Sequence, residues 1–73
     1  DLIVANILKG PLIKMASSMA KNCAPDGTVI LSGLLDVQFD EVFNVYKNQG
    51  FILKKRNSIG EWLTMRLEKK LKL

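Results

Sequence analysis

The order of hydrophobic and polar positions predicts a strand and a helix in the first third of the chain. Leu2 to Ala5 form a continuous apolar run, which is typical of a strand covered on both faces in a parallel sheet. Lys9-Gly10-Pro11 is a turn signal, and its Pro also suits a first helical turn. Apolar residues then recur at helical spacing, namely Leu12, Ile13, Met15, Ala16, Met19 and Ala20. Cys23 is expected at the helix end as a small buried residue.

The middle of the chain predicts a turn, a second strand and a second helix. Pro25-Asp26-Gly27 is a turn, because Pro fixes one φ and Gly allows a positive one. Thr28 to Leu31 form the second strand, which Ser32-Gly33 end. Asp36 is a candidate N-cap for the second helix, and Gly50 is a candidate C′ residue after it. The apolar face of this helix has i, i+3, i+4, i+7 spacing and consists of Phe39, Val42, Phe43 and Tyr46.

The last third predicts two strands joined by a short connection. The first runs from Phe51 to about Asn57, and the second from Glu61 to Leu67. A connection as short as Asn57-Ser58-Ile59-Gly60 requires the two strands to be antiparallel. Alternation on the second strand turns Trp62, Thr64 and Arg66 to one face and Leu63, Met65 and Leu67 to the other. We predict a packing role for Trp62, with ligand stacking as the alternative.

Composition limits the size of the fold and the classes of site. The 73 residues make at most one small domain, and a single core of this size rarely supplies more than roughly 3–5 kcal/mol. One cysteine permits no internal disulfide, and without histidine no Cys/His zinc cluster is possible. We therefore expect no metal. The lone cysteine fits a reducing cytoplasmic setting, and no apolar run approaches the roughly 20 residues that span a bilayer.

Positive charge gathers in two places in a chain of net charge +4. The clusters are Lys54-Lys55-Arg56 and Lys69-Lys70-Leu71-Lys72. Basic clusters can bind phosphates, but the aromatic residues do not interleave with these, so no base-stacking surface is suggested. We interpret the clusters as a solvated strand end and a solvated terminus, and we expect no specific nucleic-acid binding.

Asn6 is the polar residue that closes the first apolar run. In open α/β sheets, ligands bind just beyond the carboxyl ends of the strands, and Asn6 lies where such a site would be. Its amide offers two donors and one carbonyl acceptor. The residues alone favour a simpler role, because Asn often ends a strand by bonding to nearby backbone. Ser32-Gly33 end the second strand in the same way, and Ser32 is predicted as a helix-entry residue.

A family resemblance changes the interpretation of Asn6. Asp1-Leu2-Ile3-Val4-Ala5-Asn6-Ile7-Leu8 resembles the fourth-strand motif of class I S-adenosylmethionine-dependent methyltransferases. More narrowly, it resembles the PrmA family, which methylates amino groups of ribosomal protein eleven of the large subunit. Many amino-methylating relatives have two prolines after the Asn, whereas Ile7 and Leu8 follow here, as in PrmA. Other stretches in matching order are Gly10-Pro11-Leu12-Ile13, Asp26 to Gly33, Gly50-Phe51 and Gly60-Glu61-Trp62.

The resemblance implies an α/β fold for residues 1–73 as part of a catalytic domain. That part is the carboxy-terminal half of a class I methyltransferase Rossmann-like fold, from its fourth strand onward. Its order is β-α-β-α-β-β, with a mixed four-stranded sheet that ends in an antiparallel hairpin. The family's strands would then lie in the spatial order fourth, fifth, seventh, sixth. The first two strands would be parallel, which would place Ser32-Gly33 at the same edge of the sheet as Asn6. The family's glycine-rich loop is not found, because no two glycines have the required spacing.

The resemblance also implies a site and its partners. Asn6 would be the catalytic residue that contacts S-adenosylmethionine and orients the incoming nitrogen. The main chain at Ile7 and Leu8 would line the same cofactor pocket. The partners would be a ribosomal protein substrate and the missing amino-terminal half of the same protein, and the chain alone would be inactive. The residues leave two alternatives: a small basic module that binds RNA or the ribosome without catalysis, and a structural fragment that self-associates.

Overall fold

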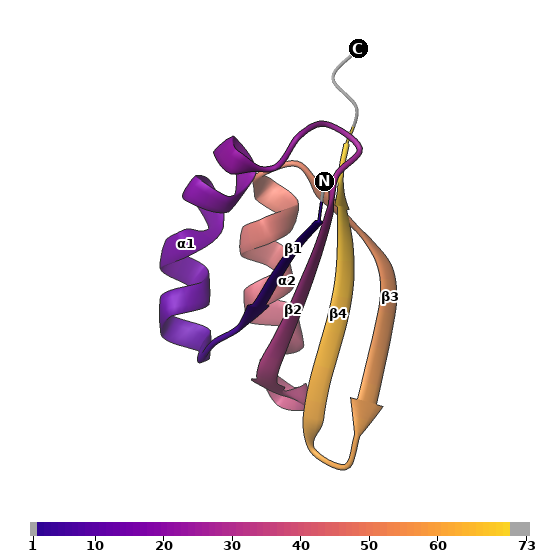
Figure 1. Cartoon of the computed structure of the whole chain (residues 1–73). Helices are drawn as coiled ribbons and strands as arrows, with labels where there is room; N and C mark the ends of the chain where they lie inside the picture. The colour runs from indigo at the N-terminus through magenta and orange to yellow at the C-terminus, as the bar shows by residue number, and fades with distance from the viewer. Residues whose placement is uncertain (1, 71–73) are drawn as a thin grey trace.

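A computed structural model describes residues 2–70 and shows two helices packed on one face of a four-stranded sheet (Figure 1). The predicted β-α-β-α-β-β order is confirmed. The elements are β1 (Leu2–Asn6), α1 (Lys9–Asn22), β2 (Thr28–Leu35), a 3₁₀ turn (Asp36–Gln38), α2 (Phe39–Asn48), β3 (Phe51–Ile59) and β4 (Trp62–Lys69). The second half of the basic tail, Leu71 and Lys72, lies outside the described residues.

The strands lie in the order β1-β2-β4-β3. β1 and β2 are parallel, and both β2–β4 and β3–β4 are antiparallel. This order is the predicted sequence of fourth, fifth, seventh and sixth family strands. The register pairs Asn6 with Ser32, so the carboxyl ends of the two parallel strands meet at one edge of the sheet.

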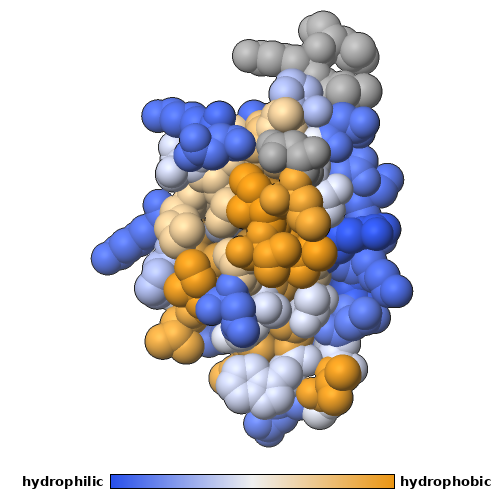
Figure 2. All heavy atoms as spheres, in the orientation of Figure 1, coloured by the Kyte–Doolittle hydropathy of each residue, from blue (hydrophilic) through white to orange (hydrophobic). Residues whose placement is uncertain are grey.

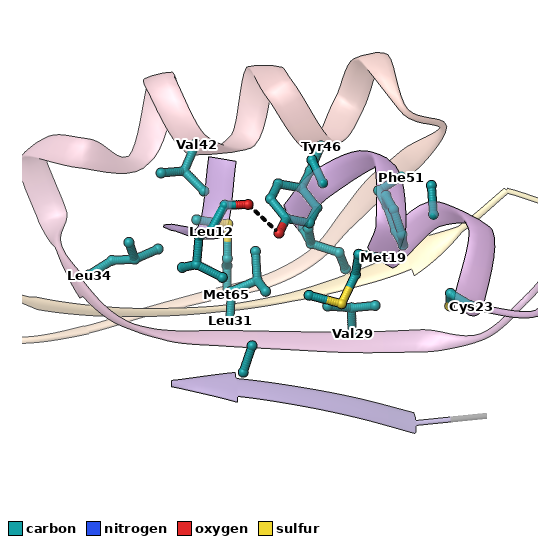
Figure 3. Packing of buried hydrophobic residues seen from close by; sticks show 14 of the residues in the cluster. Leu12, Met19, Cys23, Val29, Leu31, Leu34, Val42, Tyr46, Phe51 and Met65 are labelled. Atoms are coloured by element: carbon teal, nitrogen blue, oxygen red, sulfur yellow. Dashed lines mark hydrogen bonds between the residues drawn. The ribbon is translucent and has the colours of Figure 1, made fainter. Parts of the chain in front are cut away.

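The hydrophobic core lies between the sheet and the helices (Figure 3). Along each strand, successive side chains point to opposite faces of the sheet, so every second side chain faces the helices. On β4 these are Leu63, Met65 and Leu67, all almost fully buried, while Trp62, Thr64 and Arg66 are exposed. The predicted alternation of this strand is confirmed. On β2 the buried residues are Val29, Leu31 and Leu34.

Tyr46 joins the two helices across the core. Its hydroxyl donates a hydrogen bond of 2.8 Å to the carbonyl oxygen of Leu12, as Figure 3 shows. Burial raises the pKa of the Tyr46 hydroxyl to about 12, because the charged phenolate would lose its hydration. The neutral hydroxyl is therefore retained as a donor, and it fixes α2 against the first turn of α1.

The carboxyl end of α1 is closed by a residue from the last strand. Cys23 is buried at this end, as predicted. The Lys69 ammonium group donates hydrogen bonds to the carbonyl oxygens of Ala20 and Cys23, the latter at 3.0 Å. A cation at a helix carboxyl end satisfies free carbonyl groups and opposes the helix dipole. This contact fixes the end of β4 against α1.

Several predicted strand boundaries are wrong, because pairing with a distant segment overrides the local signal, and β4 runs from Trp62 to Lys69 where Glu61 to Leu67 was predicted. β2 does not end at Ser32-Gly33 but continues to Leu35, and its register against β4 shifts between Leu31 and Leu34. β3 continues past Asn57 to Ile59, since its last residues still pair with β4. The hairpin turn is therefore confined to residues 60–61.

Asp36 does not cap the second helix. It begins the 3₁₀ turn, and its carboxylate accepts hydrogen bonds from Ser58 at 2.6 Å and from Arg56 at 2.8 Å. The Ser58 hydrogen bond, followed by the contacts from Arg56, holds the pKa of the Asp36 carboxyl below its usual value. Arg56 also lies over the ring of Phe39, with 4.0 Å between the guanidinium carbon and the ring centroid. Because the Asp36 carboxylate binds these residues of β3, it does not cap α2.

β1 is covered on one face only within the described residues, so the expectation of cover on both faces is wrong for residues 2–70. Leu2 and Val4 point away from the helices and are 63% and 64% exposed. Figure 2 shows an apolar patch over β1 and β2, and hydrophilic residues along the side of β3. In the sheet formed by residues 2–70, β1 pairs only with β2 and is therefore an edge strand. The two edges of the sheet thus differ: the β1 edge is apolar, and the β3 edge carries Lys54 and Lys55.

We expect the 73-residue chain to self-associate through the β1 edge. An unpaired apolar edge strand is a template for pairing, whereas lysines on an edge discourage it. Val4→Lys should therefore reduce association in sedimentation equilibrium, while Ile59→Lys on the other edge, where Ile59 is 83% exposed, should not. A pure monomer of the unmodified chain at high protein concentration would contradict the prediction.

Candidate functional site at the carboxyl ends of β1 and β2

The parallel pair β1–β2 brings two polar residues to one edge of the sheet. Asn6 and Ser32 are paired directly in the register, so they share one edge of the sheet, as the family resemblance implied. Asn6 is the last residue of β1, and the chain leaves the sheet through Ile7 and Leu8 to enter α1 at Lys9. The segment Asn6-Ile7-Leu8 therefore lies at this edge of the sheet, where the chain passes from β1 to α1.

A cavity of about 430 Å³ opens at this edge. Its lining residues are Asn6, Ile7, Leu8, Gly33 and Trp62. The first three were assigned to a pocket from the sequence, and the structure places all three in the cavity wall. Gly33 and Trp62 were not assigned to it. An apolar and aromatic lining with a single polar side chain is typical of small-molecule sites.

Trp62 reaches the cavity from β4. It is 60% exposed, so the packing role that we predicted is wrong for the described residues, and the alternative of a ligand-facing aromatic fits the geometry. Asn6 and Trp62 both point away from the helices. β1 and β4 flank β2, where Asn6 pairs with Ser32 and Trp62 pairs with Leu35, three residues further along. Both side chains line the cavity beyond the end of β1.

The Asn6 side chain is available for a ligand. It is exposed, and no residue between 2 and 70 shares a hydrogen bond with its carboxamide. The role of a turn former, which requires such a bond to nearby backbone, is therefore absent from the part of the chain that the structure describes. Its carboxamide can accept a hydrogen bond at the oxygen and donate two from the nitrogen.

A second cavity, of about 410 Å³, lies at the other end of the sheet. Lys21, Lys69 and Lys70 line it, and they would suggest a site for an anion. However, Lys69 already bonds to carbonyl oxygens at the end of α1, and Lys21 is in the last turn of that helix. Helix carboxyl ends carry partial negative charge. Lys21 and Lys69 therefore compensate the carboxyl end of α1.

Other chemistry finds no support among residues 2–70. No group of three or more acidic, histidine or cysteine side chains there is placed to hold a metal ion. Cys23 is buried. None of the described helices has the length and apolar character needed to cross a membrane.

The strand order and the site together define a class of protein. A mixed sheet in the family order fourth, fifth, seventh, sixth, with a polar side chain at the end of its first parallel strand, is the carboxy-terminal half of a class I methyltransferase fold. A solved ribosomal protein L11 methylase from Lactobacillus delbrueckii subsp. bulgaricus has the same fold, with a TM-score of 0.90 at 28% identity. The match covers 96% of this chain and 36% of that one.

The sequence comparisons give the family. Residues 1–70 match the model of the family described as ribosomal protein L11 methyltransferase (PrmA). The chain belongs to this family, and the resemblance inferred from the sequence is confirmed. The ribosomal protein L11 methyltransferase of Brucella suis is 46% identical over 68 residues. That of Chromohalobacter salexigens is 45% identical over 53 residues.

The chain is much shorter than these relatives. The Brucella suis match covers 93% of this chain and 24% of the relative. The Chromohalobacter salexigens match covers 73% and 18%. This chain therefore spans about a quarter of the length of the curated relatives that it matches, and it carries the corresponding part of their fold.

Proposed function

We propose that these residues are the carboxy-terminal part of the catalytic domain of a protein methyltransferase that acts in the cytoplasm. The complete protein would transfer methyl groups from S-adenosylmethionine to amino groups of ribosomal protein L11. The proposal is supported by one observation above all: an exposed carboxamide without a hydrogen-bond partner among residues 2–70 lies at the carboxyl end of β1, beside a cavity, in a member of this family.

Asn6 is the catalytic residue of this proposal. An amine that approaches a methyl group presents N–H donors, and the Asn6 carboxamide oxygen is an acceptor for them. Such a bond turns the nitrogen lone pair toward the methyl group, and positioning of this kind accounts for much of the rate of a group transfer. Trp62 also lines the cavity and would limit the space open to the amine.

S-adenosylmethionine supplies an electrophilic methyl group when it is bound. Asn6 and the main chain at Ile7 and Leu8 would hold it here, because they line the cavity and offer carbonyl acceptors and an amide. The fit is partial. The described residues contain no glycine-rich loop around the cofactor, and no acid lines this cavity to bind the ribose. In the family these groups precede the matching strand, so they would come from the amino-terminal half of the complete protein.

We expect the 73-residue chain alone to bind S-adenosylmethionine more weakly than about 1 mM. A few hydrogen bonds worth about 1 kcal/mol each fall short of the roughly 4 kcal/mol that a millimolar dissociation constant requires. The complete protein should methylate purified ribosomal protein L11 in a transfer assay with labelled cofactor, and the chain alone should not. Micromolar binding to the chain in calorimetry, or a complete protein without transfer activity, would overturn the proposal.

The alternative of an RNA-binding module depends on the basic edge of the sheet. Lys54 and Lys55 are exposed on β3, but Arg56 is engaged with Asp36 and Phe39. We expect the change of all three basic residues to Gln to leave RNA affinity at the non-specific level at fixed salt. Lys54 and Lys55 changed alone are the control, since Arg56 then keeps its contacts. A marked loss of sequence-preferring RNA binding would favour the alternative.

A further inference from the structure

Gly33 lies against the proposed catalytic side chain, and its conformation is unusual. Its φ is +80°, in the left-handed region that favours glycine. It lies where the register of β2 against β4 shifts: Leu31 pairs with Met65 and Leu34 with Leu63. Ser32 and Gly33 therefore face the single residue Thr64, which is a β-bulge. Bulges beside active sites often redirect a side chain.

The absence of a side chain at Gly33 leaves the space in which the Asn6 carboxamide lies. A Cβ atom at Gly33 would overlap Asn6 Oδ1 and would lie 3.3 Å from the Ile7 nitrogen and 3.4 Å from the Ile7 oxygen. The Ile7 contacts involve backbone, which cannot move without shifting the strand end. The carboxamide can keep its place only if residue 33 has no Cβ atom.

The chain contains glycines that share the backbone conformation but not this contact. Gly60 has a φ of +61°, and a Cβ atom there would meet nothing within 4 Å. Asp26 has a φ of 70°, so this fold accepts a side chain at a positive φ where space allows. The backbone conformation and the contact with Asn6 can therefore be separated by experiment.

We propose that Gly33 is the positioning residue for Asn6: it holds the carboxamide oxygen at the place from which it orients the incoming amine. This inference rests on the proposed function of Asn6. Gly33 itself would contact neither the amine nor the methyl group. It acts because any larger residue displaces Oδ1 and presses on the strand end at Ile7.

The test compares Gly33→Ala with Gly60→Ala in the complete protein. Both substitutions put a Cβ atom on a residue with positive φ, but only the first meets Asn6. We expect kcat of Gly33→Ala to fall at least about tenfold below that of Gly60→Ala, with little change in KM. When residue 6 is already Ala, Gly33→Ala should lower kcat no more than Gly60→Ala does, because there is no carboxamide oxygen left to displace.

Crystal structures of the two variants give a readout that does not need activity. The Asn6 carboxamide should be displaced in Gly33→Ala and unchanged in Gly60→Ala. An unmodified complete protein without methylation activity would overturn the proposed function, while the displacement would still test the placement of Asn6 by Gly33. An undisplaced carboxamide in Gly33→Ala, or a loss of kcat that persists undiminished in the Asn6→Ala background, overturns the inference.

A second pair of variants covers the case in which Gly33→Ala does not fold. Asn tolerates the left-handed region better than Ala, so Gly33→Asn retains the Cβ atom with less backbone strain. Gly60→Asn is its control. We expect the same difference in kcat and the same displacement of the Asn6 carboxamide. Equal kcat values for the two Asn variants overturn the inference.

Discussion

Asn6→Ala in the complete protein is expected to lower the turnover number for ribosomal protein L11 methylation about 100-fold. A misplaced reacting group costs about this factor, which corresponds to about 2.7 kcal/mol of transition-state stabilisation. The melting temperature should change little, because the Asn6 side chain is exposed and shares no hydrogen bond with residues 2–70. Steady-state kinetics and thermal unfolding of the same preparations measure both effects.

Asn57→Ala is a matched control for this change. Asn57 is also an exposed asparagine on a strand of the same sheet, but it pairs with Thr64 on β4 and does not line the cavity. We expect it to retain full turnover. An Asn6→Ala enzyme with undiminished methylation would show that Asn6 serves only to end its strand.

Phe51→Ala is expected to unfold the 73-residue chain at 25 °C. Phe51 is fully buried and packs against Tyr46, with ring centroids 5.7 Å apart. Truncation of a buried Phe costs about 3–5 kcal/mol, and a core of this size rarely stabilises a chain by more than about 3–5 kcal/mol. The expected loss is therefore as large as the whole free energy of unfolding. Far-UV circular dichroism and a thermal scan of the variant measure the result.

Ile59→Ala is the control for the loss of an apolar side chain from the same strand. Ile59 is 83% exposed, and changes at exposed positions stay within about 0.5 kcal/mol. It should melt at nearly the same temperature as the unmodified chain. A Phe51→Ala chain that also keeps this midpoint would show that the hairpin does not depend on the contact with Tyr46.

Local patterns of apolar residues predicted the helices and strands well, because a helix or strand buried on one face carries its apolar residues at a fixed spacing. The alternation on β4 assigned Leu63, Met65 and Leu67 to the core before their partners were known. The errors arose where a residue has a partner far along the chain. Asp36 has the composition of a helix cap, yet it binds Arg56 and Ser58, which are 20 and 22 residues away. Local sequence contains no trace of that competition.

The site was predictable in part for the same reason. Asn6, Ile7 and Leu8 are consecutive, and the family resemblance pointed to them together. Gly33 and Trp62 join them only through the register of β2 against β1 and β4. Gly33 was interpreted as the end of a strand, because glycine commonly has that role, whereas the bulge carries β2 through it. The family resemblance placed Gly33 at the same edge as Asn6, but a sheet register cannot be derived from spacing alone, so the contact of Gly33 with Asn6 and the position of Trp62 in the cavity required the structure.

The position of β4 in the sheet has a consequence for synthesis on the ribosome. β4 is the last strand along the chain, but it lies between β2 and β3, as Figure 1 shows. β3 therefore emerges from the exit tunnel before β4, the strand with which it pairs. This part of the nascent polypeptide cannot close its sheet until residues 62–69 are released. The residues of β2 and β4 that pair are far apart along the chain, and non-local pairing of this kind is slow. A translation product that stopped before residue 62 would leave β3 unpaired and one edge of β2 open, a state prone to aggregation and in need of chaperones.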